Sequence, residues 1–321
     1  MTPTPVSRRE FVAMGAAGAT AALLHQPGSP MPESPMPERA LGRTGHRVRL
    51  FSLGGQATLE QNGTRDVSVA IVNRAIDLGV NYIDTAAAYG RGISQTYIGE
   101  VMASRRDEVF LASKTHDRTR DGSRALLEDS LTRLQTDHLD LWQLHNVMTV
   151  EQLDQIFGPG GAIEAMLQAR DEDIVRFLGI TGHWDPHVLV EGLARFEFDT
   201  ILMALNAADR HVDSFIETLL PVAVDKGIGI IGMKIPARGR IFRAGGVTTM
   251  RDAMNYVLTL PVSTVIVGCD TVAQIEENVA IARDFKPLSP EKMAALEAAT
   301  GPYAADAAFF RKSGAGWRRD S

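Results

Sequence analysis

Four positions in the sequence place an ionisable or polar side chain at or just after the end of a short apolar run. Asp84 ends one such run and Tyr89 follows in the next loop, while Lys114 and His145 close the next two runs. An ammonium beside a phenol favours phenolate, a carboxylate holds the ammonium in place, and a neutral imidazole can bond to a carbonyl oxygen. Together these groups suit carbonyl reduction or its reverse, with hydride supplied by a nicotinamide.

Each of the four residues also has a purely structural interpretation. Asp84 and Lys114 could form a structural ion pair, and His145 could be a core histidine with its hydrogen bonds satisfied. Tyr89 could be an aromatic residue at the rim. The catalytic interpretation therefore depends on whether the fold brings all four residues to one place.

From Arg47 onward, short apolar runs alternate with stretches of helical periodicity, which is typical of repeated βα units around a buried parallel sheet. We predict eight strands, at Val48–Leu53, Val80–Asp84, Val109–Thr115, Leu139–His145, Val175–Thr181, Thr200–Asn206, Ile228–Lys234 and Thr264–Cys269. Helices are expected at Asp66–Leu78, Gln95–Ala103, Ser123–Gln135, Gly161–Arg170, Pro186–Arg195, Asp213–Asp225, Thr249–Leu258 and Val272–Ala282, with a further one at Pro290–Ala299.

Eight βα units predict a (β/α)8 TIM barrel, whose chemistry lies at the C-terminal ends of its strands. A doubly wound sheet is the main alternative, but the first turn, Leu53–Ala57, lacks the G-x-G-x-x-G pattern that such sheets usually show. Before the barrel, Arg43-Thr44-Gly45 lies between two apolar stretches and predicts an N-terminal β-hairpin that closes the bottom of the barrel. We expect the barrel domain to span residues 40–300, followed by a tail of unassigned role at residues 301–321.

Residues 1–25 resemble a twin-arginine signal peptide, because Arg8-Arg9 precede an Ala/Gly-rich run from Phe11 to Leu24. An ordinary basic N-terminus is the alternative. Residues 26–39 predict a proline-rich linker that repeats Ser-Pro-Met-Pro-Glu. The twin-arginine export machinery would then carry the folded protein to the periplasm, whereas without a signal it would be cytoplasmic. No run reaches the roughly 18–20 apolar residues of a membrane span, so no stable membrane insertion is expected.

The composition narrows the choice of partners. The chain of 321 residues has 33 Lys and Arg against 39 Asp and Glu, a net charge of −6, and this balance argues against a nucleic-acid partner. The single cysteine, Cys269, excludes disulfides within the chain and multi-cysteine metal sites. Small-molecule partners are therefore expected.

The chain resembles the aldo-keto reductases over about residues 40–299. The motifs that carry the likeness are Leu41-Gly42-Arg43-Thr44-Gly45, Asp84-Thr85-Ala86-Ala87-Ala88-Tyr89-Gly90, Lys114, Asp140-Leu141-Trp142-Gln143-Leu144-His145, Gly179-Ile180-Thr181-Gly182-His183, and Val267-Gly268-Cys269 with Glu277-Asn278. The resemblance implies the same barrel, a catalytic tetrad of Asp84, Tyr89, Lys114 and His145, and reduction of a small aldehyde or ketone with NADPH or NADH.

The resemblance also implies a set of cofactor contacts. The segment Pro236–Arg240 is similar to the family's loop over the pyrophosphate. Gln274, Glu277 and Asn278 share a face of the predicted helix Val272–Ala282 by their spacing, and in the family that face meets the adenine. The implied cofactor-binding residues are Thr181, Asn206, Met233, Lys234, Arg238, Gly239, Gly268, Asp270, Gln274, Glu277 and Asn278.

Several of these positions depart from the family pattern. Thr181 takes the place of a serine, Leu202 that of a glutamine, and Met233 that of the aromatic residue that stacks on the nicotinamide. Asp270 and Thr271 stand where many NADPH-dependent members have serine and arginine. An aspartate there would repel a 2′-phosphate and accept hydrogen bonds from ribose hydroxyls, which favours NADH.

The residues expected near the mouth do not select one substrate. They are Gln56, His116, Asn146, His183, Trp184 and Arg210. Two other functions compete with the reductase. A metal hydrolase could use His116, His145 and His183, although these residues lack a metal-binding spacing. A non-catalytic protein could keep the barrel and the nucleotide site.

Overall fold

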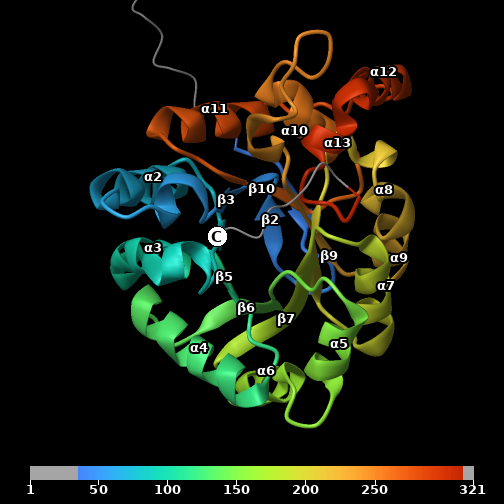
Figure 1. The fold of residues 1–321 in the computed structure, drawn as a ribbon. Helices are drawn as coiled ribbons and strands as arrows, with labels where there is room; N and C mark the ends of the chain where they lie inside the picture. Colours follow the sequence, from blue (N-terminus) through green and yellow to red (C-terminus); the bar gives the residue numbers. More distant parts are fainter. Residues whose placement is uncertain (1–34, 314–321) are drawn as a thin grey trace, which may run out of the picture. The chain divides into compact units, whose positions relative to one another are not determined.

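A closed barrel of eight parallel strands forms the centre of the structure, with helices around its outside (Figure 1). The structure is a computed structural model that describes residues 35–313. The barrel strands are β3 (Phe51–Gly54), β4 (Tyr82–Asp84), β5 (Phe110–Thr115), β6 (Leu139–Leu144), β7 (Val175–Gly182), β8 (Thr200–Ala204), β9 (Gly229–Met233) and β10 (Thr264–Gly268). Each strand pairs with the next and β10 closes on β3, so the predicted (β/α)8 TIM barrel is confirmed.

The α-helices are α2 (Arg65–Asp77), α3 (Ile93–Arg105), α4 (Arg120–Leu134), α5 (Val150–Phe157), α6 (Ala162–Asp171), α7 (Pro186–Arg195), α8 (Phe215–Thr218), α9 (Leu220–Asp225), α10 (Met250–Thr259), α11 (Val272–Arg283), α12 (Pro290–Thr300) and α13 (Ala304–Ala307). Short 3-10 turns lie at η1 (Ala57–Glu60), η2 (Tyr89–Gly92), η3 (Arg106–Glu108), η4 (Asp209–His211), η5 (Ala237–Gly239) and η6 (Gly301–Tyr303). Among residues 35–313, no helix combines the length and apolar character that crossing a bilayer requires.

The helices differ from the predicted ones in two places. The segment predicted as one helix, Asp213–Asp225, forms two short helices, because Pro221 has no amide hydrogen and its ring disturbs the preceding turn. Helix α5 was not predicted. It begins after Thr149, whose side chain accepts a hydrogen bond from the amide of Gln152 and so caps the helix.

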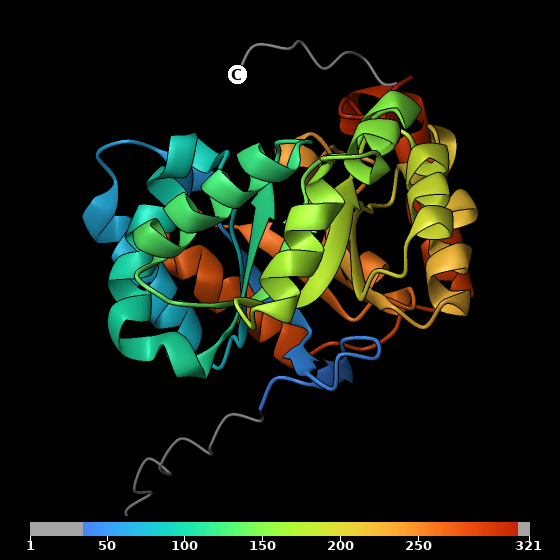
Figure 2. The same cartoon turned by 90° about the horizontal axis from the view of Figure 1, so that it is seen from below.

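The predicted N-terminal hairpin is present, with β1 (Glu38–Ala40) antiparallel to β2 (Arg47–Arg49). Its residues Leu41 and Val48 are fully buried and pack on side chains of the barrel interior, among them Tyr82 and Phe110. The hairpin therefore fills the bottom of the barrel. In Figure 2 it lies at the opposite end of the barrel from α13.

The boundaries at the start of the domain differ from the predicted ones. Val48 belongs to the hairpin and not to the first barrel strand, because the chain turns at Leu50, whose amide donates to the Pro37 carbonyl. The folded part also includes Met36, which is 2% exposed and lies in the stretch predicted as linker. The predicted signal at residues 1–25 and the linker as far as residue 34 lie outside the described residues.

The tail, to which the sequence assigned no role, folds as far as residue 313. After α12 the chain forms η6 and α13, and Phe310 and Arg311 are then almost fully buried. Phe310 contacts His183 after β7, and Arg311 pairs with Asp209 in the loop after β8.

Candidate active site

Strand alternation determines which side chains enter the barrel. In β4, Tyr82 packs inside the barrel, whereas Ile83 packs outward against the helix layer. Because successive side chains of a strand point to opposite faces, Asp84 follows Tyr82 into the barrel, and Lys114 follows Ala112 in the same way. Ladder pairing sets Asp84 opposite Ala112 in β5. The carboxylate and the ammonium therefore meet at the C-terminal ends of neighbouring strands.

Asp84 and Lys114 form a buried ion pair in which 0% and 1% of the side chains are exposed. Lys114 Nζ also donates to the Thr85 carbonyl at 2.8 Å and to Tyr89 Oη at 3.3 Å. The second carboxylate oxygen of Asp84 accepts from Gln143 Nε2 at 3.0 Å. Burial raises the pKa of Asp84 and lowers that of Lys114, and each charge opposes the effect on its partner. Direct contact favours the ionised form of each group and opposes the effect of burial.

Tyr89 is held over the ammonium by a left-handed turn. Gly90, Arg91 and Gly92 have φ values of 56°, 56° and 91°. A Cβ atom at Gly90 would lie 2.1 Å from the Glu60 carbonyl oxygen, so only glycine fits there. The turn aims the phenol at Lys114, whose Nζ lies 4.8 Å from the centre of the ring.

The sequence predicts that Lys114 lowers the pKa of Tyr89, but in the structure this pKa is raised. Burial raises the pKa of Tyr89 well above its usual range, and the negative charges of Asp84 and Glu60 raise it further, while Arg238 opposes the rise. The rise caused by burial outweighs the stabilisation that a neighbouring ammonium gives to a phenolate. Tyr89 is therefore a protonated phenol at neutral pH.

His145 follows β6, and its backbone is held in place from both sides. Its amide donates to the Thr115 carbonyl at 2.8 Å, and Arg118 Nη2 donates to its carbonyl at 2.7 Å. The His145 ring meets the Tyr89 ring edge-on, with 5.5 Å between the centroids. Burial lowers the pKa of His145 well below its usual range, and the charge of Lys114 adds to the effect. The imidazole is therefore neutral, and all four predicted residues come together at one end of the barrel.

A model of the aldo/keto reductase family matches residues 51–246. The chain belongs to this family. Its fold, its curated relatives and its solved neighbours agree in making it an NAD(P)-dependent oxidoreductase.

The relatives cover most of the chain at low identity. An uncharacterized oxidoreductase of Bacillus subtilis, YqkF, is 26% identical over 83% of this chain and 97% of its own length. L-galactose dehydrogenase of Arabidopsis thaliana is 28% identical over 82% of this chain and 94% of its own. The holo form of aldo-keto reductase AKR11C1 from Bacillus halodurans superposes with a TM-score of 0.71 at 25% identity, covering 82% and 96% of the two chains.

Three of the predicted cofactor residues lie at the ends of β7, β8 and β9, on the rim of this aldo/keto reductase barrel. Thr181 Oγ accepts from the Asn146 amide at 2.8 Å and keeps its own hydroxyl proton to donate. Asn206 braces the next loop, because its Nδ2 donates to the Lys234 carbonyl at 3.3 Å and its Oδ1 accepts from the Ala208 amide at 2.9 Å. The Asn206 amide is thus engaged within the protein. Met233 is half-buried at the end of β9.

Lys234 is a half-buried cation that pairs with no carboxylate between residues 35 and 313. Its closest polar contact in the described part of the chain is Gln56 Oε1, at 3.5 Å. Burial lowers the pKa of Lys234 to about 8, and the charge of Arg238 adds to the effect. Arg238 and Gly239 lie in η5, with φ values of 53° and 84°. This loop brings positively charged side chains to the rim, which suits the phosphates of a dinucleotide.

The contacts after β10 differ from those that the family likeness implied. The Thr271 hydroxyl caps α11 by accepting from the Gln274 amide, and the Gln274 side chain accepts from the Asp270 amide at 2.6 Å. Asp270 Oδ1 accepts from the Thr58 hydroxyl at 3.1 Å. Each of these polar groups is therefore engaged locally. Gly268 lies against the Gln56 carbonyl, where a Cβ atom would come within 2.9 Å.

Gln274, Glu277 and Asn278, whose spacing predicts a common helix face, differ in their exposure. Gln274 and Glu277 are exposed, whereas Asn278 is 4% exposed and its Nδ2 contacts Cys269 Sγ at 3.3 Å. The reason is that α11 rests on the barrel along the side that carries Asn278. Among the three, Gln274 and Glu277 remain accessible to a nucleotide.

Two of the residues expected near the mouth, His183 and Arg210, have different surroundings. His183 is 8% exposed and close to the carbonyl of Phe310, with its ring edge-on to the Phe310 ring. Burial lowers the pKa of His183 to about 3, and the charge of Lys234 adds to the effect. Arg210, by contrast, is bound to Glu217 and Glu297 on the outer side of the domain.

Sequence reasoning missed Gln143, Arg118 and Arg311. Strand alternation could have found Gln143, since it lies two residues before His145 and therefore faces the same side. Arg118 and Arg311 carry no local signal, because each is recruited by contacts distant in sequence. Across residues 35–313, no three His, Cys, Asp or Glu side chains are grouped as metal ligands would be.

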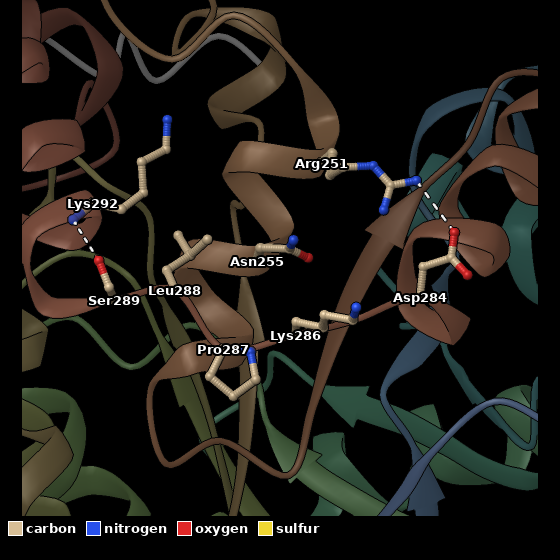
Figure 3. A pocket seen from close by; sticks show the side chains of 8 residues that line it. All are labelled: Arg251, Asn255, Asp284, Lys286, Pro287, Leu288, Ser289 and Lys292. Carbon is tan, nitrogen blue, oxygen red and sulfur yellow. Dashed lines mark hydrogen bonds and ion pairs between the residues drawn. The ribbon is translucent and has the colours of Figure 1, made fainter.

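A surface pocket of about 560 Å³ lies on the outer wall, away from the strand ends (Figure 3). It is lined by Arg251, Asn255, Asp284, Lys286, Pro287, Leu288, Ser289 and Lys292. None of these residues belongs to the tetrad or to the rim loops described above.

Removing only one partner of the buried ion pair should destabilise the protein strongly. Lys114→Met leaves the Asp84 carboxylate buried without a cation, which should cost about 3–5 kcal/mol of unfolding free energy. The double variant Asp84→Asn/Lys114→Met leaves no buried charge and should lose less. Reversible denaturant unfolding, followed by circular dichroism, measures both values. A double variant less stable than Lys114→Met would contradict an ionised pair.

Proposed function

We propose that the protein reduces the carbonyl group of a small aldehyde or ketone, or catalyses the reverse oxidation, with Tyr89 as the proton donor. The observation that carries the proposal is the contact of Lys114 Nζ with both the Asp84 carboxylate and Tyr89 Oη, beside a neutral His145. A carbonyl screen with NADPH and NADH tests the proposal.

Each residue of the tetrad has a role that follows from its charge state. The protonated phenol of Tyr89 gives its proton to the carbonyl oxygen, and the Lys114 ammonium then stabilises the phenolate through the existing hydrogen bond. Asp84 keeps Lys114 charged and fixed in position. His145, being neutral, donates a hydrogen bond to the substrate oxygen and orients it without competing for the proton.

The rim residues fit a nicotinamide dinucleotide. Thr181 retains a donor, and Lys234 carries a positive charge that is not paired with a carboxylate among the described residues. Gly239 has open space where a Cβ atom would stand, and Gly268 packs closely on the Gln56 backbone. We propose that these residues, with Met233 and Arg238, hold the cofactor, which supplies the hydride when bound. Asn206 would act indirectly, by bracing the Lys234 backbone. A non-catalytic nucleotide-binding barrel is less favoured, since all four catalytic groups are present and within reach of one another.

The coenzyme is NADPH or NADH. The preference for NADH that Asp270 suggested finds no support among the neighbours, since an aldo-keto reductase from Klebsiella pneumoniae with the same fold, at 24% identity and a TM-score of 0.70, was solved in complex with NADPH. Asp270 and Thr271 are also both engaged in local hydrogen bonds. Lys234 and Arg238 are alternative partners for a 2′-phosphate.

Replacing the phenol by a phenyl ring should remove the proton donor while preserving the packing. Tyr89→Phe should lower kcat by roughly 10²- to 10⁴-fold and leave nucleotide affinity nearly unchanged. Adding Lys114→Met should then cost little more, because the lysine acts through the phenol. Steady-state kinetics and fluorescence titration of the nucleotide measure these effects. Full turnover by Tyr89→Phe would require another proton donor.

The choice of coenzyme can be tested at the two positions after β10. If Asp270 and Thr271 set it, NADH binds at least as well as NADPH, and Asp270→Ser/Thr271→Arg shifts preference toward NADPH by about tenfold or less. Dissociation constants for both coenzymes in both proteins give the answer. A strong preference of the native protein for NADPH would instead assign the 2′-phosphate to Lys234 or Arg238.

We further propose that residues 1–25 act as a twin-arginine signal and that the protein is exported to the periplasm with its nucleotide already bound. Arg8-Arg9 before the Ala/Gly-rich run supports this, and the only cysteine of the chain, Cys269, is buried and needs no oxidising compartment. If the signal interpretation fails, the protein stays in the cytoplasm.

Replacing both arginines by lysine separates export from catalysis. Arg8→Lys/Arg9→Lys should leave the folded enzyme in the cytoplasm, with unchanged activity in cell extracts, because the twin-arginine pair is read by the export machinery alone. Cell fractionation with an activity assay measures this. Export of the variant at the native level would remove the signal proposal.

A further inference from the structure

The C-terminal segment from Tyr303 to Ser313, called here the strap, joins three loops of the barrel mouth. Its far end is firmly anchored. Arg311 is 1% exposed, pairs with Asp209, donates to the Ala204 carbonyl at 2.9 Å and stacks 3.6 Å from the centre of the Phe215 ring. These contacts fix the strap to the loop after β8.

The last two residues of the strap extend this anchor. The Lys312 amide donates to the Trp184 carbonyl at 3.0 Å, in the loop after β7, and the Ser313 amide donates to Asp213 at 2.8 Å. The strap is therefore tied to two loops independently of the loop after β9.

At the near end of the strap, Asp306 makes the ion pairs with the loop after β9. Asp306 accepts from Arg240 at 2.8 Å and also pairs with Arg243. The two guanidinium groups lie over strap rings, with Arg240 4.3 Å from the centre of Phe309 and Arg243 5.0 Å from that of Tyr303. Two positive groups of the loop thus converge on Asp306.

The side chain of Tyr303 also bonds to the backbone of this loop. The Asp306 ion pairs, the two ring contacts and these bonds are together called here the clamp. Tyr303 Oη donates to the Ile241 carbonyl at 3.0 Å and accepts from the Val247 amide at 3.2 Å. Unlike the buried Arg311 pair, the Asp306 pairs are partly exposed, with 36% of the Asp306 side chain accessible. The clamp is therefore the weaker end of the strap.

The clamped loop is strained. Lys234, Ala237 and Arg238 have φ values of 61°, 48° and 53°, a left-handed conformation that side chains with a Cβ atom rarely adopt. Three such residues in one short loop persist only where surrounding contacts hold them. The Asp306 clamp supplies contacts of this kind from outside the loop.

We propose that Asp306 is a positioning residue that keeps the loop after β9 closed at the barrel mouth and thereby controls the release of the nicotinamide nucleotide. The inference rests on the proposed function, because it takes Lys234 and Arg238 of this loop as nucleotide contacts. When the clamp opens, the strained loop relaxes and these two cations move away from the mouth. Loop opening of this kind commonly limits product release.

The experiment compares the full-length protein with Asp306→Asn, Asp306→Glu and the control Asp284→Asn. Asp284 is an exposed carboxylate paired with Arg251 at 3.6 Å on the outer wall, where it touches neither loop nor strap. Stopped-flow displacement of NADPH by excess NADP⁺ measures nucleotide release. Trypsin digestion of the nucleotide-free proteins, read by mass spectrometry, measures exposure of Arg238, Arg240 and Arg243.

Asp306→Asn should raise the NADPH dissociation rate by about tenfold, since two partly exposed ion pairs are lost, and should speed trypsin cleavage in the loop. Asp306→Glu should restore both toward the native values, and Asp284→Asn should change neither. If Asp306→Asn binds NADPH and is cleaved faster but releases NADPH at the native rate, the loop does not control nucleotide release and the proposal is overturned. Unchanged cleavage would overturn the clamp itself.

The two proposals fail in different ways. If the native protein bound neither NADPH nor NADH, the proposed function would fall, and control of nucleotide release would fall with it. The trypsin comparison would still decide whether Asp306 holds the loop, because it needs no nucleotide.

Discussion

A carboxylate and an ammonium are buried side by side at the end of the barrel, and the arrangement of the surrounding site depends on this ion pair. Removing an ion from water costs several kcal/mol, and mutual attraction offsets that cost only when the contact is direct and the remaining polar atoms are satisfied. Here Lys114 finds three acceptors, and both carboxylate oxygens of Asp84 are bonded. The pair therefore depends on the pairing of β4, β5 and β6. A slip of one residue would turn Lys114 or Gln143 out of the barrel.

The protonation states of the other two tetrad residues follow from this pair. Burial and the negative charges of Asp84 and Glu60 raise the pKa of Tyr89, so its phenol stays protonated. Burial and the charge of Lys114 lower the pKa of His145, which is therefore neutral. A protonated donor and a neutral orienting group are the forms that carbonyl reduction needs. In the proposed reaction, Lys114 stabilises the phenolate after proton transfer and does not create it beforehand.

The sequence predicted the parts of the molecule that depend on local pattern. Strand alternation and apolar runs were enough for the barrel, the hairpin and the positions of Asp84 and Lys114, because a parallel strand buried on both faces leaves a clear pattern. Helix α5 escaped because it is short and is defined mainly by the cap at Thr149.

The parts that were missed depend on contacts between distant segments. Asn278 turned inward because of how α11 packs, and Thr271 and Gln274 form a cap with each other that family likeness does not show. The strap is the largest omission. Arg311 reaches Asp209 across about a hundred residues of chain, and no local periodicity encodes such a contact.

The most direct test of this account is the pH dependence of kcat/KM for an aldehyde, measured at saturating reduced coenzyme. The account predicts a flat profile from about pH 6 to pH 9, because neither the imidazole of His145 nor the phenol of Tyr89 titrates in that range. A limb near the ordinary histidine pKa that disappears in His145→Ala would contradict the neutral imidazole. A decline above about pH 8 from loss of the Tyr89 proton would contradict the protonated phenol on which the mechanism depends.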